Sequence, residues 1–338
     1  MIKVAMIGFG GIAQSAHLTP HFEIEKKGIS KLVAVCDIRP EQFDTQIEIN
    51  IGGSDAKLRD DIKRYTDWKE MLEKEDIDMV DICVPTFLHA PIAIGALEMG
   101  CHVLSEKPMS LNYGLCKEMY ETADRVGKKL MIAQCCRFGP AYLYIKKLVD
   151  ENTYGKTKSA VLTRLGAAPM WSWENWYMDE NRSGGAILDL HIHDIDLIRY
   201  IWGNPNSVSC CAQDINSGKD IAHSRLMYDD FSVMAIGDWS REKVGFETGT
   251  TVSSEKATVI RKGGKITVYP RGDAEAFSPE LPPIDSYQAE IEYFMDIIAN
   301  NKENKENDPK DSALSVKLVN TLVESSEKNG EFVPFKTI

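Results

Sequence analysis

The feature that most constrains this fold is the alternation of short apolar runs with amphipathic stretches over the first 135 residues. The apolar runs are IKVAMIG (2–8), KLVAVCD (31–37), DMVDICVP (78–85), CHVLSEK (101–107) and KLMIAQ (129–134). Amphipathic stretches lie between them at 11–27, 41–49, 67–74, 88–99 and 111–126. Buried β-runs alternating with helices indicate a parallel sheet covered on both faces, and right-handed crossovers make it doubly wound. We therefore predict a doubly wound α/β domain over residues 1–135.

The pattern changes after about residue 155, where strand-like segments follow one another with few helices between them. These segments are 157–165, 206–214, 222–228, 231–239, 243–253, 256–261 and 265–269. Helical patterns cover 185–202, 285–300 and 310–328. Runs of strands followed by helices are typical of an α+β domain on a mainly antiparallel sheet. We predict such a domain over residues 136–338, with the last helix, 310–328, packing back on the first domain.

Composition excludes several classes of function. The net charge of −12 disfavours non-specific binding to nucleic acid. The eight cysteines contain no C-x-x-C pair, which excludes zinc-ribbon motifs and favours buried, reduced thiols. The opening MIKVAMIG runs directly into a glycine-rich turn, so we expect no signal peptide, and no apolar run approaches the roughly 20 residues of a membrane span. We expect a cytoplasmic protein that binds neither nucleic acid nor a membrane.

A glycine-rich turn follows the first apolar run and opens the first helix. It reads Gly8-Phe9-Gly10-Gly11-Ile12-Ala13, a G-x-G-x-x-A pattern. Gly8 permits the tight turn, Gly10 allows close approach of a pyrophosphate, and Ala13 allows the helix to pack on the strand. The pyrophosphate then lies at the helix N-terminus, where free N–H groups favour anions. All six residues are candidate cofactor contacts.

The type of dinucleotide is indicated by the end of the second apolar run. Asp37 lies 24 residues after Ala13, where a carboxylate accepts hydrogen bonds from ribose hydroxyls and repels a 2′-phosphate. This predicts NAD. Arg39, two residues later, keeps NADP as an alternative, because an arginine accommodates that phosphate.

Two further turns follow apolar runs at the carboxyl edge of the predicted sheet, where ligands of such sheets bind. The first contains Pro85, Thr86 and His89, which are candidate cofactor contacts, although a structural role for His89 is as well supported. The second contains Glu106 and Lys107, followed by Pro108. A lysine held in such a turn can shift its pKa and share a proton with a substrate.

The stretch GGAILDLHIHDID (184–196) carries two histidines two residues apart and allows two interpretations. On a strand, His191 and His193 could chelate one metal ion. On a helix they point about 200° apart, since each residue turns the chain by about 100°. The apolar spacing favours a helix, which places Asp189, His193, Asp196 and Tyr200 on one stripe. We therefore predict an Asp189–His193 acid–base pair, no metal site, and a structural or interface role for His191.

Aromatic residues cluster immediately before this stretch, namely Trp171, Trp173, Trp176 and Tyr177. Such rings could stack on a sugar and shield the cofactor from water, or they could serve core or lid packing. The sequence leaves both open, and Trp176 is the best candidate for substrate contact.

Taken together, four motifs resemble those of the GFO/IDH/MocA oxidoreductases. They are GFGGIA at the N-terminus, P-T-x-x-H at 85–89, HVLSEKP at 102–108 and GGAILDLHIHDID at 184–196. The resemblance implies a Rossmann domain followed by an α/β domain whose large open antiparallel sheet forms homodimer or homotetramer contacts. It implies that Lys107 is catalytic, that Asp189 and His193 are the D-x-x-x-H pair, and that Glu106 supports the cofactor side. It also implies a cis peptide before Pro108.

The chain departs from the family pattern at two places. Thr86 stands where Asn is common, and Cys135-Cys136 precedes Arg137 where many members carry Asn before Arg. The second position often contacts substrate, so Arg137 is a further candidate for substrate contact, together with Trp176 and His193.

The sequence therefore predicts an oxidoreductase that uses NAD, with NADP as the alternative, to oxidise a secondary alcohol of a sugar, cyclitol or derivative. In this hypothesis His193 is the general base, Asp189 orients it, and Lys107 stabilises the reacting oxygen. A second hypothesis keeps the cofactor bound through a redox-assisted elimination, hydrolysis or sugar–sugar exchange. A third is a non-catalytic NAD-binding sensor, and a fourth is a metal-dependent hydrolase.

Overall fold

The computed structural model describes residues 1–47 and 56–337. The chain divides into two compact units, Met1–Cys135 with Asp285–Ala313, and Cys136–Ile284 with Leu314–Ile338. The boundary after residue 135 coincides with the predicted one. The assignment of 285–313 differs from the prediction, which placed this segment in the second domain.

The described residues of the first unit contain a six-stranded parallel sheet in the order β3-β2-β1-β4-β5-β6. The strands are β1 (Ile2–Ile7), β2 (Ser30–Cys36), β3 (Lys63–Tyr65), β4 (Met79–Ile82), β5 (His102–Glu106) and β6 (Leu130–Ala133). Five of them are the predicted apolar runs, which confirms the doubly wound fold. The prediction missed β3, because this short edge strand carries charged side chains and no apolar run.

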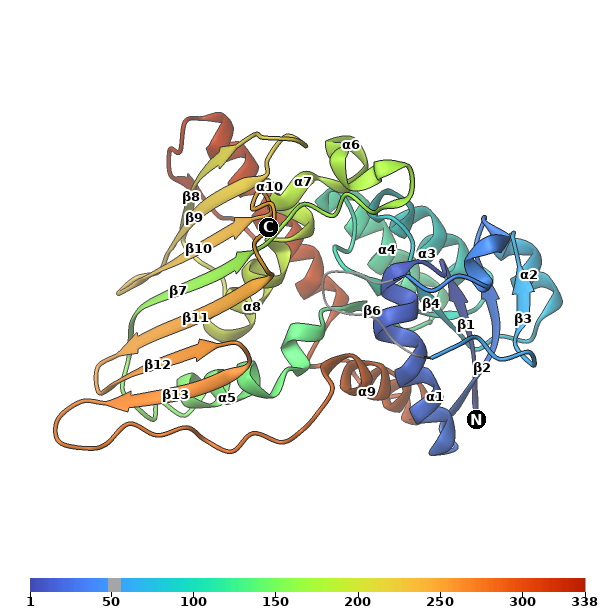
Figure 1. Ribbon diagram of the computed structural model, residues 1–338, viewed down its shortest axis with the longest axis horizontal. Coiled ribbons are helices and arrows are strands. Elements are labelled where there is room, and N and C mark those ends of the chain that lie inside the picture. The colour runs from blue at the N-terminus through green and yellow to red at the C-terminus, as the bar shows by residue number, and fades with distance from the viewer. Residues whose placement is uncertain (48–55, 338) are drawn as a thin grey trace. The chain divides into compact units, whose positions relative to one another are not determined.

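Helices cover both faces of this sheet (Figure 1). They are α1 (Leu18–Lys26), α2 (Trp68–Lys74), α3 (His89–Glu98), α4 (Tyr113–Val126) and α9 (Ser286–Asn300), with shorter turns η1 (Ala13–His17), η2 (Pro40–Phe43) and η3 (Thr86–Leu88). The strand order runs one way from β1 to β3 and the other way from β4 to β6. Right-handed crossovers therefore place the connecting helices of the two halves on opposite faces.

Two helical predictions in this unit need correction. The stretch 41–49 forms only the single turn η2 and no helix through residue 47, and its last two residues lie outside the described part of the chain. Helix α9, from the predicted 285–300 segment, packs against α1, β5 and β6. Its buried Ile291 and Phe294 belong to the same apolar core as Met6 of β1 and Leu104 of β5. This shared core explains why the segment belongs to the first unit.

The described residues of the second unit form an eight-stranded sheet in the order β13-β12-β11-β7-β10-β9-β8-β14. The strands are β7 (Thr157–Leu165), β8 (Ser207–Gln213), β9 (Ile221–Met227), β10 (Ser232–Asp238), β11 (Glu247–Ser254), β12 (Ala257–Lys262), β13 (Lys265–Pro270) and β14 (Val333–Pro334). Every pair is antiparallel except β7 with β10, which is parallel. The predicted, mainly antiparallel sheet is confirmed (Figure 1).

One face of this sheet packs against helices, and side chains on the other face are exposed. Helices α7 (Gly185–Asp189) and α8 (Ile192–Trp202) contact β7, β9 and β10. On the other face, Val161 of β7 and Met234 of β10 are register partners and remain 39% and 37% exposed. The expected oligomer contact through this face stays a prediction.

The predicted single helix over 185–202 is wrong in one respect, because the chain breaks between α7 and α8. The N–H of His191 donates to the carbonyl oxygen of Ala186, five residues back, in place of the usual four. This extra residue interrupts the helix at Leu190 and His191. The remaining helices of the unit are α5 (Pro140–Asp150), α6 (Glu180–Ser183) and the turn η5 (Trp173–Met178), while α10 (Pro309–Glu327) crosses from the first unit into the second.

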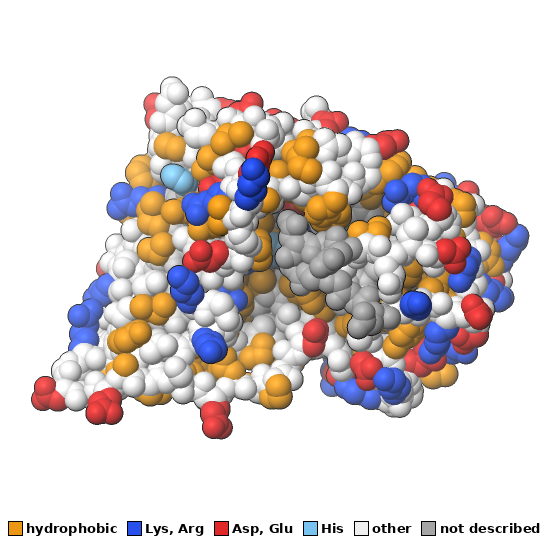
Figure 2. All heavy atoms as spheres, viewed as in Figure 1, with side chains coloured by type: hydrophobic (Ala, Val, Ile, Leu, Met, Phe, Trp, Pro, Cys, Tyr) orange, Lys and Arg blue, Asp and Glu red, His pale blue; other side chains and the backbone are white. Residues whose placement is uncertain are grey.

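Acidic and basic side chains are interspersed over the visible surface (Figure 2). Of the helices in the described part of the chain, none combines the length and apolarity required to cross a bilayer.

Candidate functional site

The glycine-rich turn in the first unit has the geometry that the dinucleotide motif requires. Gly8 has φ +89°, and a Cβ there would lie 2.5 Å from the carbonyl oxygen of Cys83. Apart from its two neighbours in the chain, no described residue has an atom within 4 Å of a Cβ built on Gly10. The backbone conformation and the neighbouring Cys83 carbonyl therefore require glycine at position 8. At position 10, the described residues leave space beside the backbone. This open space beside the backbone fits a bound pyrophosphate.

Asp37 ties the glycine-rich turn to the end of β2. One carboxylate oxygen accepts the Phe9 N–H at 2.8 Å, and the other accepts the Arg39 N–H at 2.9 Å. The side chain of Arg39 also approaches Asp37, with Nε 3.9 Å from the carboxylate. A carboxylate oxygen accepts more than one hydrogen bond, so Asp37 can hold the turn and also receive a ribose hydroxyl.

The sequence analysis missed Gln14, which fixes the same turn from the helix side. Its amide nitrogen lies 2.9 Å from the carbonyl oxygen of Phe9 and 3.2 Å from that of Gln42. Its amide oxygen accepts the Ile47 N–H at 3.0 Å. The signal in the sequence is a polar residue directly after Ala13, at a position that the structure buries.

The second predicted turn, after β4, places Pro85 and Thr86 at the carboxyl edge of the sheet. Thr86 is buried, and its hydroxyl makes no hydrogen bond to any described residue, which is compatible with a cofactor contact. His89 is different. Its Nδ1 lies 2.7 Å from the carbonyl oxygen of Pro108 and its Nε2 lies 2.8 Å from that of Val84.

These contacts give His89 a structural role. Burial lowers the pKa of its imidazole, and both ring nitrogens face backbone oxygens. The ring therefore connects the turn after β4 with the turn that contains Pro108. His89 thus holds these turns, and its predicted contact with the cofactor stays a prediction.

The Glu106-Lys107-Pro108 turn follows β5 directly. The peptide between Lys107 and Pro108 is cis, as the resemblance implies. Glu106 is buried, and its Oε2 accepts the Lys107 N–H at 3.0 Å. Lys107 is partly buried. The carboxylate of Glu106 thus holds the backbone from which the Lys107 side chain extends.

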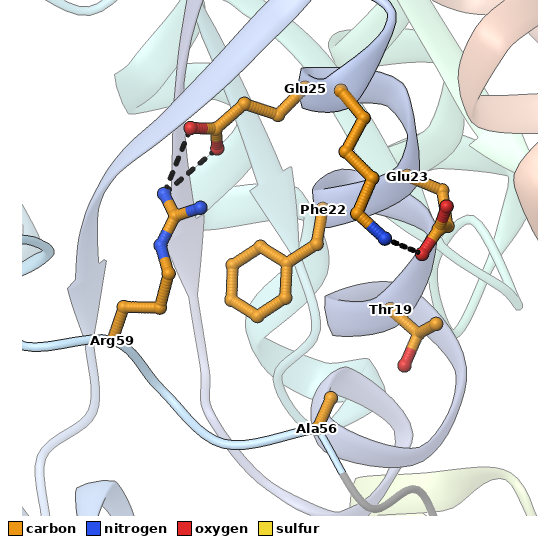
Figure 3. Close-up of a pocket in the computed structure, with 7 residues that line it drawn as sticks. Thr19, Phe22, Glu23, Glu25, Ala56 and Arg59 are labelled. Carbon is orange, nitrogen blue, oxygen red and sulfur yellow. Dashed lines mark hydrogen bonds and ion pairs between the residues drawn. The ribbon is translucent and has the colours of Figure 1, made fainter.

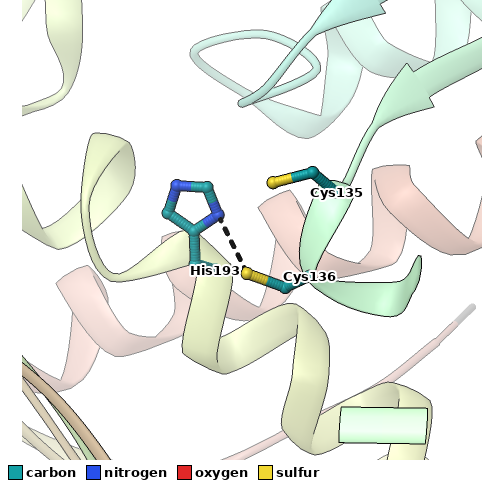
Figure 4. Close-up of side chains that lie close together, drawn as sticks. All are labelled: Cys135, Cys136 and His193. Atoms are coloured by element: carbon teal, nitrogen blue, oxygen red, sulfur yellow. Dashed lines mark hydrogen bonds between the residues drawn. The ribbon is translucent and has the colours of Figure 1, made fainter. Parts of the chain in front are cut away.

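In the second unit, Asp189 ends α7 and His193 lies in the first turn of α8. Asp189 is buried and His193 is partly buried. Nδ1 of His193 lies 3.9 Å from the thiol sulfur of Cys136 (Figure 4). The thiol is a weak partner at this distance. Cys136 lies where the chain departs from the family pattern, and ligand atoms of Cys135, Cys136 and His193 lie within 4.8 Å of one another.

His191 lies in a different environment from His193. It is fully buried, its Nε2 lies 2.9 Å from the Ser224 hydroxyl, and burial lowers its pKa to about 4. Its ring also packs so closely on Gly237 that a Cβ there would lie 2.8 Å from Nδ1. A histidine held neutral in the core is a structural residue.

The other acidic residues of this stretch form buried ion pairs. Asp194 pairs with Arg164 at 3.0 and 3.1 Å, and Asp196 pairs with Arg137 at 2.6 and 2.7 Å. The guanidinium of Arg137 also lies over the ring of Tyr200, 5.0 Å from its centroid. Arg137 is 3% exposed. Arg137 therefore holds α8 through Asp196, and its predicted contact with substrate stays a prediction.

The aromatic cluster is packed on itself. Trp176 is buried and stacks on Tyr177, with ring centroids 3.8 Å apart. Trp171 contacts Tyr177 edge-on at 5.9 Å and remains 44% exposed. One face of Trp176 is thus covered by Tyr177, which supports a packing role for that face.

A pocket of about 740 Å³ lies on the first unit, and its lining includes none of the predicted site residues (Figure 3). Its lining residues are Thr19, Phe22, Glu23, Glu25, Lys26, Ala56 and Arg59. Arg59 binds both carboxylate oxygens of Glu25 and lies over the ring of Phe22. Since these charged groups pair with one another, we assign the pocket no role.

Comparison with known proteins identifies both units. Residues 2–134 match the oxidoreductase family with an NAD-binding Rossmann fold, and residues 142–260 match the GFO/IDH/MocA C-terminal domain. The solved structure of levoglucosan dehydrogenase with NADH and L-sorbose has the same fold. Its TM-score is 0.85 at 20% identity, covering 100% of this chain and 99% of that chain.

Relatives with assigned activities match a smaller part of the chain than this solved structure does. The chain is 30% identical over 207 residues to D-glucoside 3-dehydrogenase of Escherichia coli, covering 60% of this chain and 55% of that protein. It is 29% identical over 207 residues to 2,7-anhydro-N-acetylneuraminate hydratase of Mediterraneibacter gnavus, covering 61% and 50%. The chain thus spans about half the length of these curated relatives. The two matched domains and the glycine-turn geometry establish that the chain belongs to the GFO/IDH/MocA oxidoreductase family, whose Rossmann domain binds NAD.

Proposed function

We propose that the protein is an NAD-dependent dehydrogenase that oxidises a secondary alcohol of a sugar, a cyclitol or a derivative of either. The observation that carries the proposal is the carboxyl edge of the first unit's sheet. There, the glycine turn held by Asp37 follows β1, and the Lys107 turn follows β5. A dinucleotide fold with a lysine at the same edge supports hydride chemistry on an alcohol.

Each proposed catalytic residue has a separate role. Bound NAD would supply the hydride acceptor. Lys107 donates a hydrogen bond to the reacting oxygen and stabilises the charge that develops on it. His193 accepts the hydroxyl proton as general base, and Asp189 orients that imidazole or binds a neighbouring hydroxyl. These roles rest on the family motifs and on the placement of each residue within its own unit.

A second candidate function retains the cofactor through each turnover, with oxidation, elimination or hydrolysis, and reduction of the same sugar. The relative named as a hydratase, at 29% identity, favours this alternative. The two functions differ in whether reduced cofactor leaves the enzyme. Stoichiometric NADH released into solution during turnover supports the dehydrogenase, whereas product formation without free NADH supports the alternative.

The decisive experiment is a substrate panel read by the absorbance of reduced cofactor. The panel contains inositols, hexoses, amino sugars and their acids, each assayed with NAD and with NADP. We expect NAD reduction with one substrate class and little with the others. If no member of the panel supports either cofactor reduction or conversion of the sugar, the proposed function is wrong.

The choice of NAD over NADP is tested by Asp37→Asn. The amide keeps an acceptor for the glycine turn but removes the negative charge that repels a 2′-phosphate. We expect the ratio of kcat/KM for NAD to that for NADP to fall by about tenfold or more, which is about 1.4 kcal/mol. Arg39 adds to this effect by binding the phosphate.

A matched control is Asp44→Asn, which removes a carboxylate of the same unit that is exposed and paired with Arg64. It should leave the ratio unchanged, since exposed ion pairs contribute little. An unchanged ratio in Asp37→Asn would contradict the assignment of Asp37 to the ribose.

A further inference from the structure

A buried cluster of ionisable side chains lies beneath the cofactor edge of the first unit. At its centre is His17, which ends the turn η1 and is 0% exposed. Its Nδ1 lies 2.8 Å from Oδ2 of Asp81 on β4, and its Nε2 lies 2.9 Å from Oε1 of Glu106 on β5. One imidazole therefore joins the helix after the glycine turn to two neighbouring strands.

Further groups face this cluster from other elements. His21 of α1 places its Nε2 2.8 Å from the same oxygen of Asp81, and the thiol of Cys83 lies 3.6 Å from its other oxygen. Burial, together with the charge of Asp81, raises the pKa of Cys83 to about 12, so the sulfur keeps its proton and donates it. The ring of Tyr287 on α9 lies against His17, with centroids 5.9 Å apart.

Two protons on the ring of His17 would satisfy both of its contacts. A neutral imidazole carries one N–H and can donate to only one carboxylate. Here both ring nitrogens lie at the distance of charge-assisted hydrogen bonds, which is about 2.7–2.9 Å. Burial opposes a charge on His17, but the Asp81 carboxylate outweighs this and raises its pKa well above 6.5. The imidazole is therefore doubly protonated, between two carboxylates.

A metal ion is the alternative explanation for donor atoms of His17, Asp81 and Cys83 that lie within 4.8 Å of one another. A tetrahedral zinc with ligands at about 2.1 Å would separate its ligand atoms by about 3.4 Å. The N···O distances of 2.8 and 2.9 Å are shorter and match shared protons. The geometry therefore favours hydrogen bonds.

The cluster continues to the Lys107 turn through Glu106. Oε1 of Glu106 faces His17, while Oε2 accepts the Lys107 backbone N–H at 3.0 Å. On the other side of this turn, His89 lies 2.7 Å from the carbonyl oxygen of Pro108. The backbone on either side of the lysine is thus held by one buried carboxylate and one buried imidazole.

We propose that His17 is a positioning residue, which as an imidazolium orients the Glu106 carboxylate and through it the Lys107 turn. The inference rests on the proposed function, because it assigns His17 an effect on the reaction of Lys107. It adds a role for the polar residue four positions after the glycine motif and for Asp81, the one acid within the strand β4. Neither was among the predicted site residues.

The charge on His17 is tested without any substrate. In protein labelled with ¹⁵N-histidine, long-range proton–nitrogen spectra at pH 8 distinguish an imidazolium from a neutral ring. We expect an imidazolium signal that is absent from the spectrum of His17→Gln. A neutral His17 at pH 8 would overturn the proposal, as would stoichiometric zinc in the purified holoprotein by elemental analysis.

The effect on the reaction is tested by a pair of substitutions that each keep one donor. Asn places its amide nitrogen where Nδ1 was, facing Asp81, and Gln places its amide nitrogen where Nε2 was, facing Glu106. We expect kcat of His17→Asn to be about tenfold or more below that of His17→Gln, since small misplacements at a reacting centre cost up to about 10²-fold. The KM for NAD should change by less than about threefold in both.

The matched control is His102→Gln, which removes a partly buried histidine at the opposite end of β5, where its Nδ1 accepts the Lys129 N–H. It should keep wild-type kcat. A second variant, Glu106→Gln, keeps the size of the side chain and should lower kcat by about tenfold or more even if His17→Asn fails to fold.

The outcomes separate this inference from the proposed function. Equal kcat in His17→Asn and His17→Gln, or wild-type kcat in Glu106→Gln, would overturn the positioning role while dehydrogenase activity stands. A protein without dehydrogenase activity that still shows the His17 imidazolium would overturn the proposed function, and with it the catalytic role of His17.

Discussion

Replacement of His193 or Lys107 by alanine is expected to lower kcat by about 10²–10⁴-fold, the usual contribution of a positioned acid or base. His193→Ala removes the group that accepts the hydroxyl proton, and Lys107→Ala removes the donor that stabilises charge on the reacting oxygen. His193 lies at the partly buried start of α8, and Lys107 is partly buried after β5. Neither side chain belongs to the buried Arg137–Asp196 and Arg164–Asp194 ion pairs.

The measurement is steady-state kinetics on the substrate that the panel identifies, together with NAD titration and thermal unfolding of each variant. We expect NAD affinity and Tm to stay close to wild type while kcat falls. The matched controls are His223→Ala on β9 and Lys117→Ala on α4, both exposed, which should keep full activity. Turnover within about threefold of wild type in both active-site variants would contradict the assigned roles.

The second large effect concerns the glycine turn, where two neighbouring glycines should respond in opposite ways. Gly8→Ala should destabilise the first unit severely. Its Cβ would overlap the Cys83 carbonyl at 2.5 Å, and its φ of +89° is strained for any other residue. Backbone strain and overpacking each cost about 1–3 kcal/mol. We expect a loss of about 2–6 kcal/mol in the free energy of unfolding.

Gly10→Ala should leave stability unchanged but weaken NAD binding. Apart from its two neighbours in the chain, no described residue has an atom within 4 Å of the added Cβ, so the described part of the protein accommodates the methyl group. The methyl group occupies the space through which the backbone approaches a pyrophosphate. We expect a rise in Kd for NAD of about tenfold or more, which is about 1.4 kcal/mol.

Thermal unfolding and NAD titration of the two variants provide the comparison, and each variant serves as the control for the other. Wild-type stability in Gly8→Ala would show that the turn does not have the conformation described here. Wild-type NAD affinity in Gly10→Ala would place the pyrophosphate elsewhere.

Local patterns in the sequence predicted most of the architecture. Apolar runs such as IKVAMIG and KLVAVCD became β1 and β2, because strands buried on both faces are apolar along their whole length. The glycine turn and the role of Asp37 could likewise be predicted from the sequence. The turn conformation is set by its own glycines, and the acid directly follows the apolar run that forms β2. The strand β3 was not predicted, because an edge strand does not require an apolar run.

Contacts between residues far apart in the sequence determined the features that these local patterns could not predict. The sequence placed α9 in the second domain, but Ile291 and Phe294 belong to the core of the first unit. The helix pattern over 185–202 gave no sign of the break at His191, whose ring packs against Ser224 and Gly237 only in the folded chain. Arg137 and Asp196 are 59 residues apart and pair only in the folded chain.

By itself, the sequence determined the fold class, the dinucleotide turn and the identity of the candidate catalytic residues, because each depends on periodicity or on a short motif. Only the tertiary structure decided which polar residues are structural and which support the cofactor edge. His17, Asp81 and Glu106 are separated by 64 and 25 residues in the chain, and no local pattern links them. Their shared protons arise because the parallel strands β4 and β5 lie side by side under η1, where burial makes every charge require a partner.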